Sequence, residues 1–88
     1  MKFEANAKSL LDELMAPFPF LMRAMAKKMI EGKIAEEAKK AGHAEANIDD
    51  VVRGYIIVGL SRGNDAEKIK NSLVGKIDDV SKYDELFA

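Results

Sequence analysis

The chain offers few residues that could perform chemistry, and their spacing matches no catalytic pattern. It has one histidine, His43, and no cysteine. His43 and Glu45 could supply two metal ligands, but a metal site needs three or four ligands with supporting hydrogen bonds. No arrangement of serine and carboxylate around His43 suggests a triad. Without cysteine there is also no thiol nucleophile, disulfide framework or thiolate-held metal. We therefore expect a non-enzymatic protein with no catalytic residue, metal or cofactor.

Two pairs of adjacent carboxylates could be mistaken for acid/base pairs. They are Asp49-Asp50 and Asp78-Asp79. Each pair lies where a helix is expected to begin, and negative charge stabilises that end of a helix. We interpret both pairs as helix caps, and we expect Asn47 or Asp49 to be the capping residue of the helix near residue 50.

A methionine face is the first candidate binding surface. Met22, Met25 and Met29 share one side of an expected helix over residues 20–41. Thioethers adapt to varied shapes and could stack on a flat tetrapyrrole, which makes these methionines weak candidates for small-molecule binding. An apolar stripe at helical spacing more often fills a core. We therefore predict that the methionines are core residues.

A basic face on the same helix is the second candidate. Residues 17–42 carry six cations and three carboxylates, and Lys27 and Lys28 are adjacent. Such a helix could touch an anionic membrane or a nucleic acid. The formal net charge of −1 makes nucleic-acid binding unlikely. The favoured interpretation is a solvated face, with Lys27 paired to Glu31 four residues on.

Arg23 is the sharpest single candidate for an interaction. It lies in the first turn of the expected helix, where the helix dipole disfavours positive charge. A residue placed against local preference indicates a specific contact. We expect a contact with an acidic side chain or a helix C-terminus within the domain, in preference to a ligand.

The elements that position these residues are helices. The 88 residues form one domain, 1–88, because a chain of this length buries one modest core. Apolar spacing predicts an all-α bundle of four to five helices around a central helix at about 20–41. The other helices are expected before Pro17, between Asn47 and about Gly59, and in two short pieces after residue 64. Beyond the apolar face expected on the third helix, Ile57, Val58 and Leu60 are candidates for an exposed patch or for a sandwiched helix.

Residues 17 to 58 resemble a known family. The first element is Pro19-Phe20-Leu21-Met22-Arg23, followed by Ala26-Lys27-Lys28 and Glu31; the second is Gly42 followed by Ile48-Asp49-Asp50-Val51-Val52. This pattern is similar to the small C-terminal domain of the B subunit of light-independent (dark-operative) protochlorophyllide reductase and its free-standing homologues. The resemblance implies a helical module that packs against a partner. It carries over no catalytic residue.

These observations together predict a small helical module that binds another protein or a second copy of itself. The alternative is a protein that binds a small molecule of the tetrapyrrole type. Weak binding to nucleic acid or to an anionic membrane is a third, less favoured reading. No stretch is long and apolar enough to span a bilayer, and the expected location is cytoplasmic.

Overall fold

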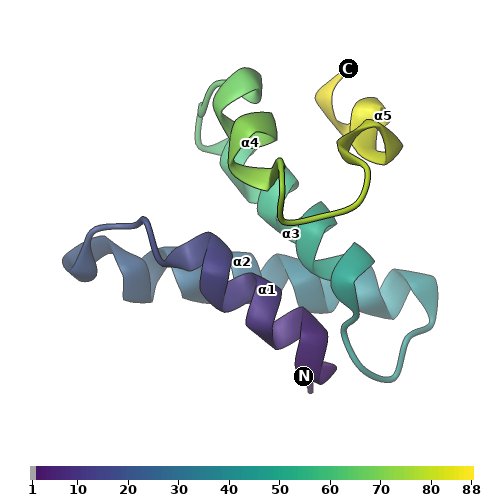
Figure 1. Ribbon diagram of the computed structural model, residues 1–88. Coiled ribbons are helices and arrows are strands. Elements are labelled where there is room, and N and C mark those ends of the chain that lie inside the picture. Colours follow the sequence, from purple (N-terminus) through teal and green to yellow (C-terminus); the bar gives the residue numbers. More distant parts are fainter. Residues whose placement is uncertain (1) are drawn as a thin grey trace.

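A computed structural model describes residues 2–88 as a bundle of helices (Figure 1). The elements are α1 (Ala5–Met15), α2 (Phe20–Ala41), α3 (Ile48–Ser61), α4 (Ala66–Leu73), a 3₁₀ turn η1 (Val80–Tyr83) and α5 (Asp84–Phe87). The all-α prediction is confirmed. α3 contacts α1, α2, α4 and α5, and α2 is the longest helix and packs along α3. α1 and α2 lie together below α3, while α4 and α5 lie above it in Figure 1.

The boundaries of α1 and α2 follow from local chemistry. α1 ends at Met15, just before the Pro17-Phe18-Pro19 turn. Ala16 keeps helical dihedral angles (φ −55°, ψ −40°), so the expectation that the residue before proline leaves the helical region is wrong here, and it is Pro17, which has no N–H to donate, that stops the helix. α2 continues through Gly32 without interruption and ends at Ala41. Gly42 follows with φ +78°, and its N–H donates to the carbonyls of the last turn. A glycine here is favoured because side chains disfavour this left-handed conformation.

The third helix begins with a complete capping box. The Asn47 side chain accepts from the Asp50 N–H, and the Asp50 carboxylate accepts from the Asn47 N–H, both at 3.0 Å. Asn47 is therefore the cap of α3. Asp65 caps α4 by accepting from the Glu67 N–H.

The core lies where the second half of α2 crosses α3. Ile34 on α2 and Ile56 on α3 are fully buried, together with Leu11 from α1. The crossing is close because Gly54 has no side chain: a Cβ atom there would lie 2.5 Å from Ile34 Cγ1 and 2.9 Å from the Ile34 backbone nitrogen. Gly54 therefore sets how near α2 and α3 approach.

The methionine prediction is wrong. Met22, Met25 and Met29 are exposed, and the buried residues of α2 are Ile30, Ile34 and Ala38, all in its second half. The apolar positions move around the helix between the two halves, and only the later set faces α3. No helix within residues 2–88 combines the length and the apolar character needed to cross a bilayer.

Candidate functional site

Exposed apolar side chains gather on the first half of α2. We call them the α2 strip: Phe20, Leu21, Met22, Met25 and Met29. Phe20 is 81% exposed, Leu21 89% and Met25 66%. Isolated apolar side chains are ordinary on a protein surface, but five large ones exposed within ten residues make this part of α2 a candidate binding surface.

Part of the α2 strip borders a groove of about 420 Å³. We call it the α2–α3–α4 groove, since those helices and the turn before α2 form its walls. Its lining is apolar except for Arg62, Asn64 and the Tyr55 hydroxyl. The lining residues are Phe18, Leu21, Met22, Met25, Ala26, Ile30, Tyr55, Val58, Gly59, Arg62, Asn64 and Ile69.

The groove is open because α3 covers only one part of α2, and the rest of α2 extends beyond that part. The Gly54–Ile34 contact fixes the crossing on the second half of α2. The first half then projects past α3 toward the α1–α2 turn, at the left in Figure 1. Nothing else in residues 2–88 covers that half, so its apolar side chains face solvent.

Two polar contacts lie at the edges of the groove. Arg62 Nη1 donates to the sulfur of Met29 at 3.1 Å. The Tyr55 hydroxyl lies 2.8 Å from the Ser72 hydroxyl and links α3 to α4. The thioether is only a weak acceptor, so a stronger acceptor could displace it from Arg62.

Arg23 holds the α1–α2 corner together. Its Nη2 donates to the carbonyls of Ala16 at 3.2 Å and Phe18 at 2.9 Å. Ala16 is the C-cap of α1, so the expected contact with a helix C-terminus is confirmed. The guanidinium places positive charge at the end where the α1 dipole favours it. The Arg23 Nε atom is buried without a hydrogen-bond partner among the described residues.

The ion pairs of the basic face on α2 differ from the predicted ones. Lys27 reaches α1 and lies 3.7 Å from Asp12, so the pairing with Glu31 is wrong. Lys28 is exposed and makes no ion pair within residues 2–88. An exposed pair such as Lys27–Asp12 contributes about 0–1 kcal/mol.

The α3 candidates are partly or wholly buried. Val58 is buried and lines the groove. Leu60 is partly buried against the core, and Ile57 is half-buried. Val58 therefore joins the methionines in one surface, while Ile57 and Leu60 lie outside the groove lining.

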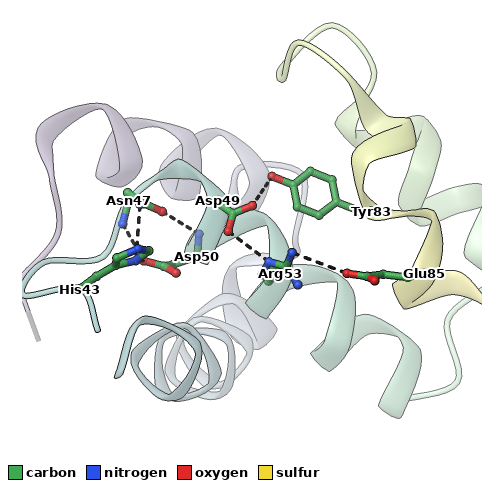
Figure 2. Close-up of polar contacts among 7 residues, drawn as sticks. All are labelled: His43, Asn47, Asp49, Asp50, Arg53, Tyr83 and Glu85. Carbon is green, nitrogen blue, oxygen red and sulfur yellow. Dashed lines mark hydrogen bonds and ion pairs between the residues drawn. The ribbon is translucent and has the colours of Figure 1, made fainter. Parts of the chain in front are cut away.

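A polar cluster at the start of α3 includes the histidine (Figure 2). His43 Nδ1 lies 2.8 Å from Asp50 Oδ2, and the Asp50 carboxylate is almost wholly buried. Glu45 plays no part in this contact. Within the described residues, no group of three or more histidine or carboxylate side chains is placed to hold a metal ion. The cluster fastens the α2–α3 loop to the first turn of α3.

A second polar cluster ties the C-terminal segment to α3 (Figure 2). The Tyr83 hydroxyl donates to Asp49 Oδ1 at 2.9 Å, and Arg53 Nε donates to Asp49 Oδ2 at 3.1 Å. Burial, and then the bond to Asp49, raise the pKa of Tyr83 well above its ordinary value. Burial lowers the pKa of Arg53, but Asp49 and Glu85 raise it overall. Asp49 therefore holds Tyr83 and Arg53 in addition to stabilising the N-terminus of α3.

Sequence reasoning named the α2 methionines as weak binding candidates and Val58 on α3 as an interaction candidate, but it missed the rest of the opposite wall of the groove. Tyr55, Arg62 and Ile69 come from segments thirty or more residues further along the chain. Ile69 could be identified as apolar but not as a neighbour of Met25. No spacing rule connects residues on different helices, so no signal in the single sequence could have joined them.

The fold and the groove define a class of protein: a small all-α domain with an open apolar surface. The chain belongs to the family described as "Protein of unknown function (DUF2621)", which it matches over residues 1–87. A relative in Bacillus subtilis (strain 168), named "Membrane protein YneK", is 39% identical over 79 residues. That match covers 90% of this chain and 54% of the relative, so the chain spans about half the relative's length. No solved structure matches.

These comparisons correct two expectations. The relative's name contradicts the expected cytoplasmic location. It also conflicts with the protochlorophyllide reductase-like assignment, to which neither the family nor the relative provides a link. The matched elements around Pro19 and Gly42 are explained by helix boundaries, since Pro19 precedes α2 and Gly42 follows it. Proline at the start of a helix and glycine just after its end recur in unrelated helical proteins.

Proposed function

We propose that this chain is a non-enzymatic binding module that holds one amphipathic helix of another protein in the α2–α3–α4 groove. The observation that carries the proposal is the groove itself, with Leu21, Met22 and Met25 exposed along its edge. Laying an apolar helix face into an apolar groove is a common mode of peptide recognition.

The dimensions of the groove support a helical occupant. Residues 20–30 of α2 extend about 16 Å at 1.5 Å per residue, which matches about three turns of a partner helix. The methionines suit such a surface because their flexible, polarisable side chains repack around different partners.

The charges of the groove indicate the chemistry of the partner. Arg62 is its only charged lining residue, and its guanidinium is held only by the weak Met29 thioether. A partner carboxylate would be a stronger acceptor. The partner helix is therefore apolar on one face with an acidic residue near one end.

A displayed library of helical peptides tests the proposal, with the whole chain as bait. Peptides with apolar residues at i, i+3 or i+4, and i+7, and with a flanking Asp or Glu, should be enriched. Met25→Glu should lose them, because it places a carboxylate at the groove edge. Ala24→Glu is the matched control, since Ala24 is exposed on the same helix outside the groove.

The same experiment can reject the proposal. Equal capture by the Met25→Glu and Ala24→Glu variants would place peptide binding elsewhere. Light scattering at two protein concentrations tests whether the chain self-associates. A dimer that Met25→Glu dissociates would make a second copy the occupant of the groove.

A small apolar molecule is the second candidate occupant. The groove volume lies within the range of small-molecule sites, and three thioethers border it or lie beside it. Titration with a porphyrin should shift the Met22, Met25 and Met29 methyl resonances. Unchanged resonances would discard the tetrapyrrole alternative.

A further inference from the structure

A second exposed surface lies on the side of α2 away from the groove. Phe20, Ala24 and Lys28 recur every four residues, so they share one face of the helix, and Leu21 borders it. Phe20 is 81% exposed and does not line the groove. We call this surface, made by Phe20, Leu21, Ala24 and Lys28, the α2 corner.

The α2 corner protrudes from the bundle. It lies beside the α1–α2 turn, at the end of the molecule away from α5 (Figure 1). Two proline residues and the Arg23 bonds to the Ala16 and Phe18 carbonyls fix the turn. A phenylalanine and a leucine are thus held out in solvent at a rigid projection.

The charges beside these apolar residues have one sign. Residues 14–30 contain three cations and no carboxylate. Arg23 holds only backbone carbonyls, Lys27 is within 3.7 Å of Asp12, and Lys28 has no ion pair within residues 2–88. The nearest carboxylates in the sequence are Glu13 on α1 and Glu31 on α2, at the two ends of this stretch.

We propose that the α2 corner docks on an anionic lipid surface. Phe20 and Leu21 enter the boundary between head groups and acyl chains, and Lys28, with Lys27, contacts lipid phosphates. Apolar residues beside lysines are typical of segments that lie in the plane of a bilayer interface. A protein groove would supply complementary carboxylates at a few points, whereas an anionic bilayer supplies negative charge over the whole corner. This inference goes beyond the proposed function, because Phe20, Ala24 and Lys28 do not line the groove, and Leu21 alone borders both surfaces.

Vesicle sedimentation tests the charged half of the proposal. The probe is vesicles of equal parts phosphatidylcholine and phosphatidylglycerol, with pure phosphatidylcholine as the neutral comparison. The chain should sediment with the anionic vesicles, and rising salt should release it. Lys28→Glu should weaken binding roughly tenfold. Lys39→Glu is the control, since it makes the same charge change at the other exposed end of α2.

Fluorescence tests the apolar half, because the chain has no tryptophan. The emission of Phe20→Trp should shift to the blue when anionic vesicles are added. That of Val74→Trp, at another exposed apolar position, should stay unchanged.

Three results would overturn the proposal. They are equal binding to the neutral vesicles, equal loss in the Lys28→Glu and Lys39→Glu variants, and no emission shift in Phe20→Trp. A shift that depends on protein concentration without vesicles would assign the corner to self-association. The groove variant Met25→Glu, scored with peptides, reports on the proposed function separately.

Discussion

The two halves of α2 both carry apolar side chains but have opposite surroundings. The first half, Phe20 to Met29, carries five large exposed apolar residues. The second half buries Ile30, Ile34 and Ala38 against the rest of the bundle. Both halves belong to one continuous helix, so helix formation does not distinguish them.

The difference shows that one helix can serve the core and a surface at once. In the second half the apolar side chains meet α3, and their burial stabilises the fold. In the first half the large apolar side chains stay mostly exposed, although Met29 accepts a hydrogen bond from Arg62. Apolar surface that the fold leaves uncovered is available for binding, and both proposed surfaces lie in this half.

Substitution of one apolar residue in each half tests this comparison most strongly. Ile34→Ala should lower the free energy of unfolding by about 2–5 kcal/mol, because it leaves a cavity at the crossing. Met25→Ala should change it by no more than about 0.5 kcal/mol, because Met25 is mostly exposed. Urea unfolding followed by circular dichroism measures both. Similar losses in the two variants would break the comparison.

Gly54→Ala should have the next largest effect on stability, because Gly54 makes the contact through which α3 covers the second half of α2. The added Cβ would meet the Ile34 backbone nitrogen at 2.9 Å, so α2 and α3 must separate. We expect a loss of about 1–3 kcal/mol in the free energy of unfolding. Gly59→Ala is the control, since its Cβ would meet only the mobile end of Ile69 at 2.9 Å. The contact argument fails if Gly59→Ala proves the more damaging variant.

Arg23→Met should loosen the turn between α1 and α2, which positions the first half of α2. It removes two hydrogen bonds from a charged donor, both near the surface, and should cost about 1 kcal/mol. Hydrogen exchange should rise at the Phe18 amide, which donates to the Met15 carbonyl across the turn. Exchange near Ile34 should stay slow. Faster exchange along the whole of α2 would mean that the two halves are one cooperative unit.

Gly32→Ala, between the two halves, should have the smallest effect and the opposite sign. A Cβ at Gly32 would meet nothing within 4 Å, and alanine favours a helix interior over glycine. The free energy of unfolding should rise by about 0.5–1 kcal/mol, measured as a higher urea midpoint. A loss of stability would indicate that α2 needs a flexible joint between its halves.

Much of the fold could be predicted because it depends on local rules. Pro17 and Pro19 set the break between α1 and α2, Gly42 ends α2, and Asn47 caps α3. The assignment of the methionines to the core failed because periodicity shows that residues share a face. It does not show whether another helix covers that face.

The candidate site was predicted only in part, because only some of its residues carry a local signal. Arg23 was found from its conflict with the helix dipole, which is a local signal. The opposite wall of the groove, with Tyr55, Arg62 and Ile69, depends on contacts between distant segments. The buried contact between Asp50 and His43 across the loop was missed because the carboxylate was explained as a cap alone.

The sequence by itself determined that the chain is helical, that the first helix breaks from the second at the prolines, and that Gly42 ends the second, because those features rest on propensity, capping and proline geometry. Only the tertiary structure decided which half of α2 is buried. The Gly54–Ile34 contact places the crossing late on α2. Its position leaves Phe20, Leu21 and Met25 uncovered, because the 14-residue α3 crosses the 22-residue α2 in its second half and does not reach the start of the first.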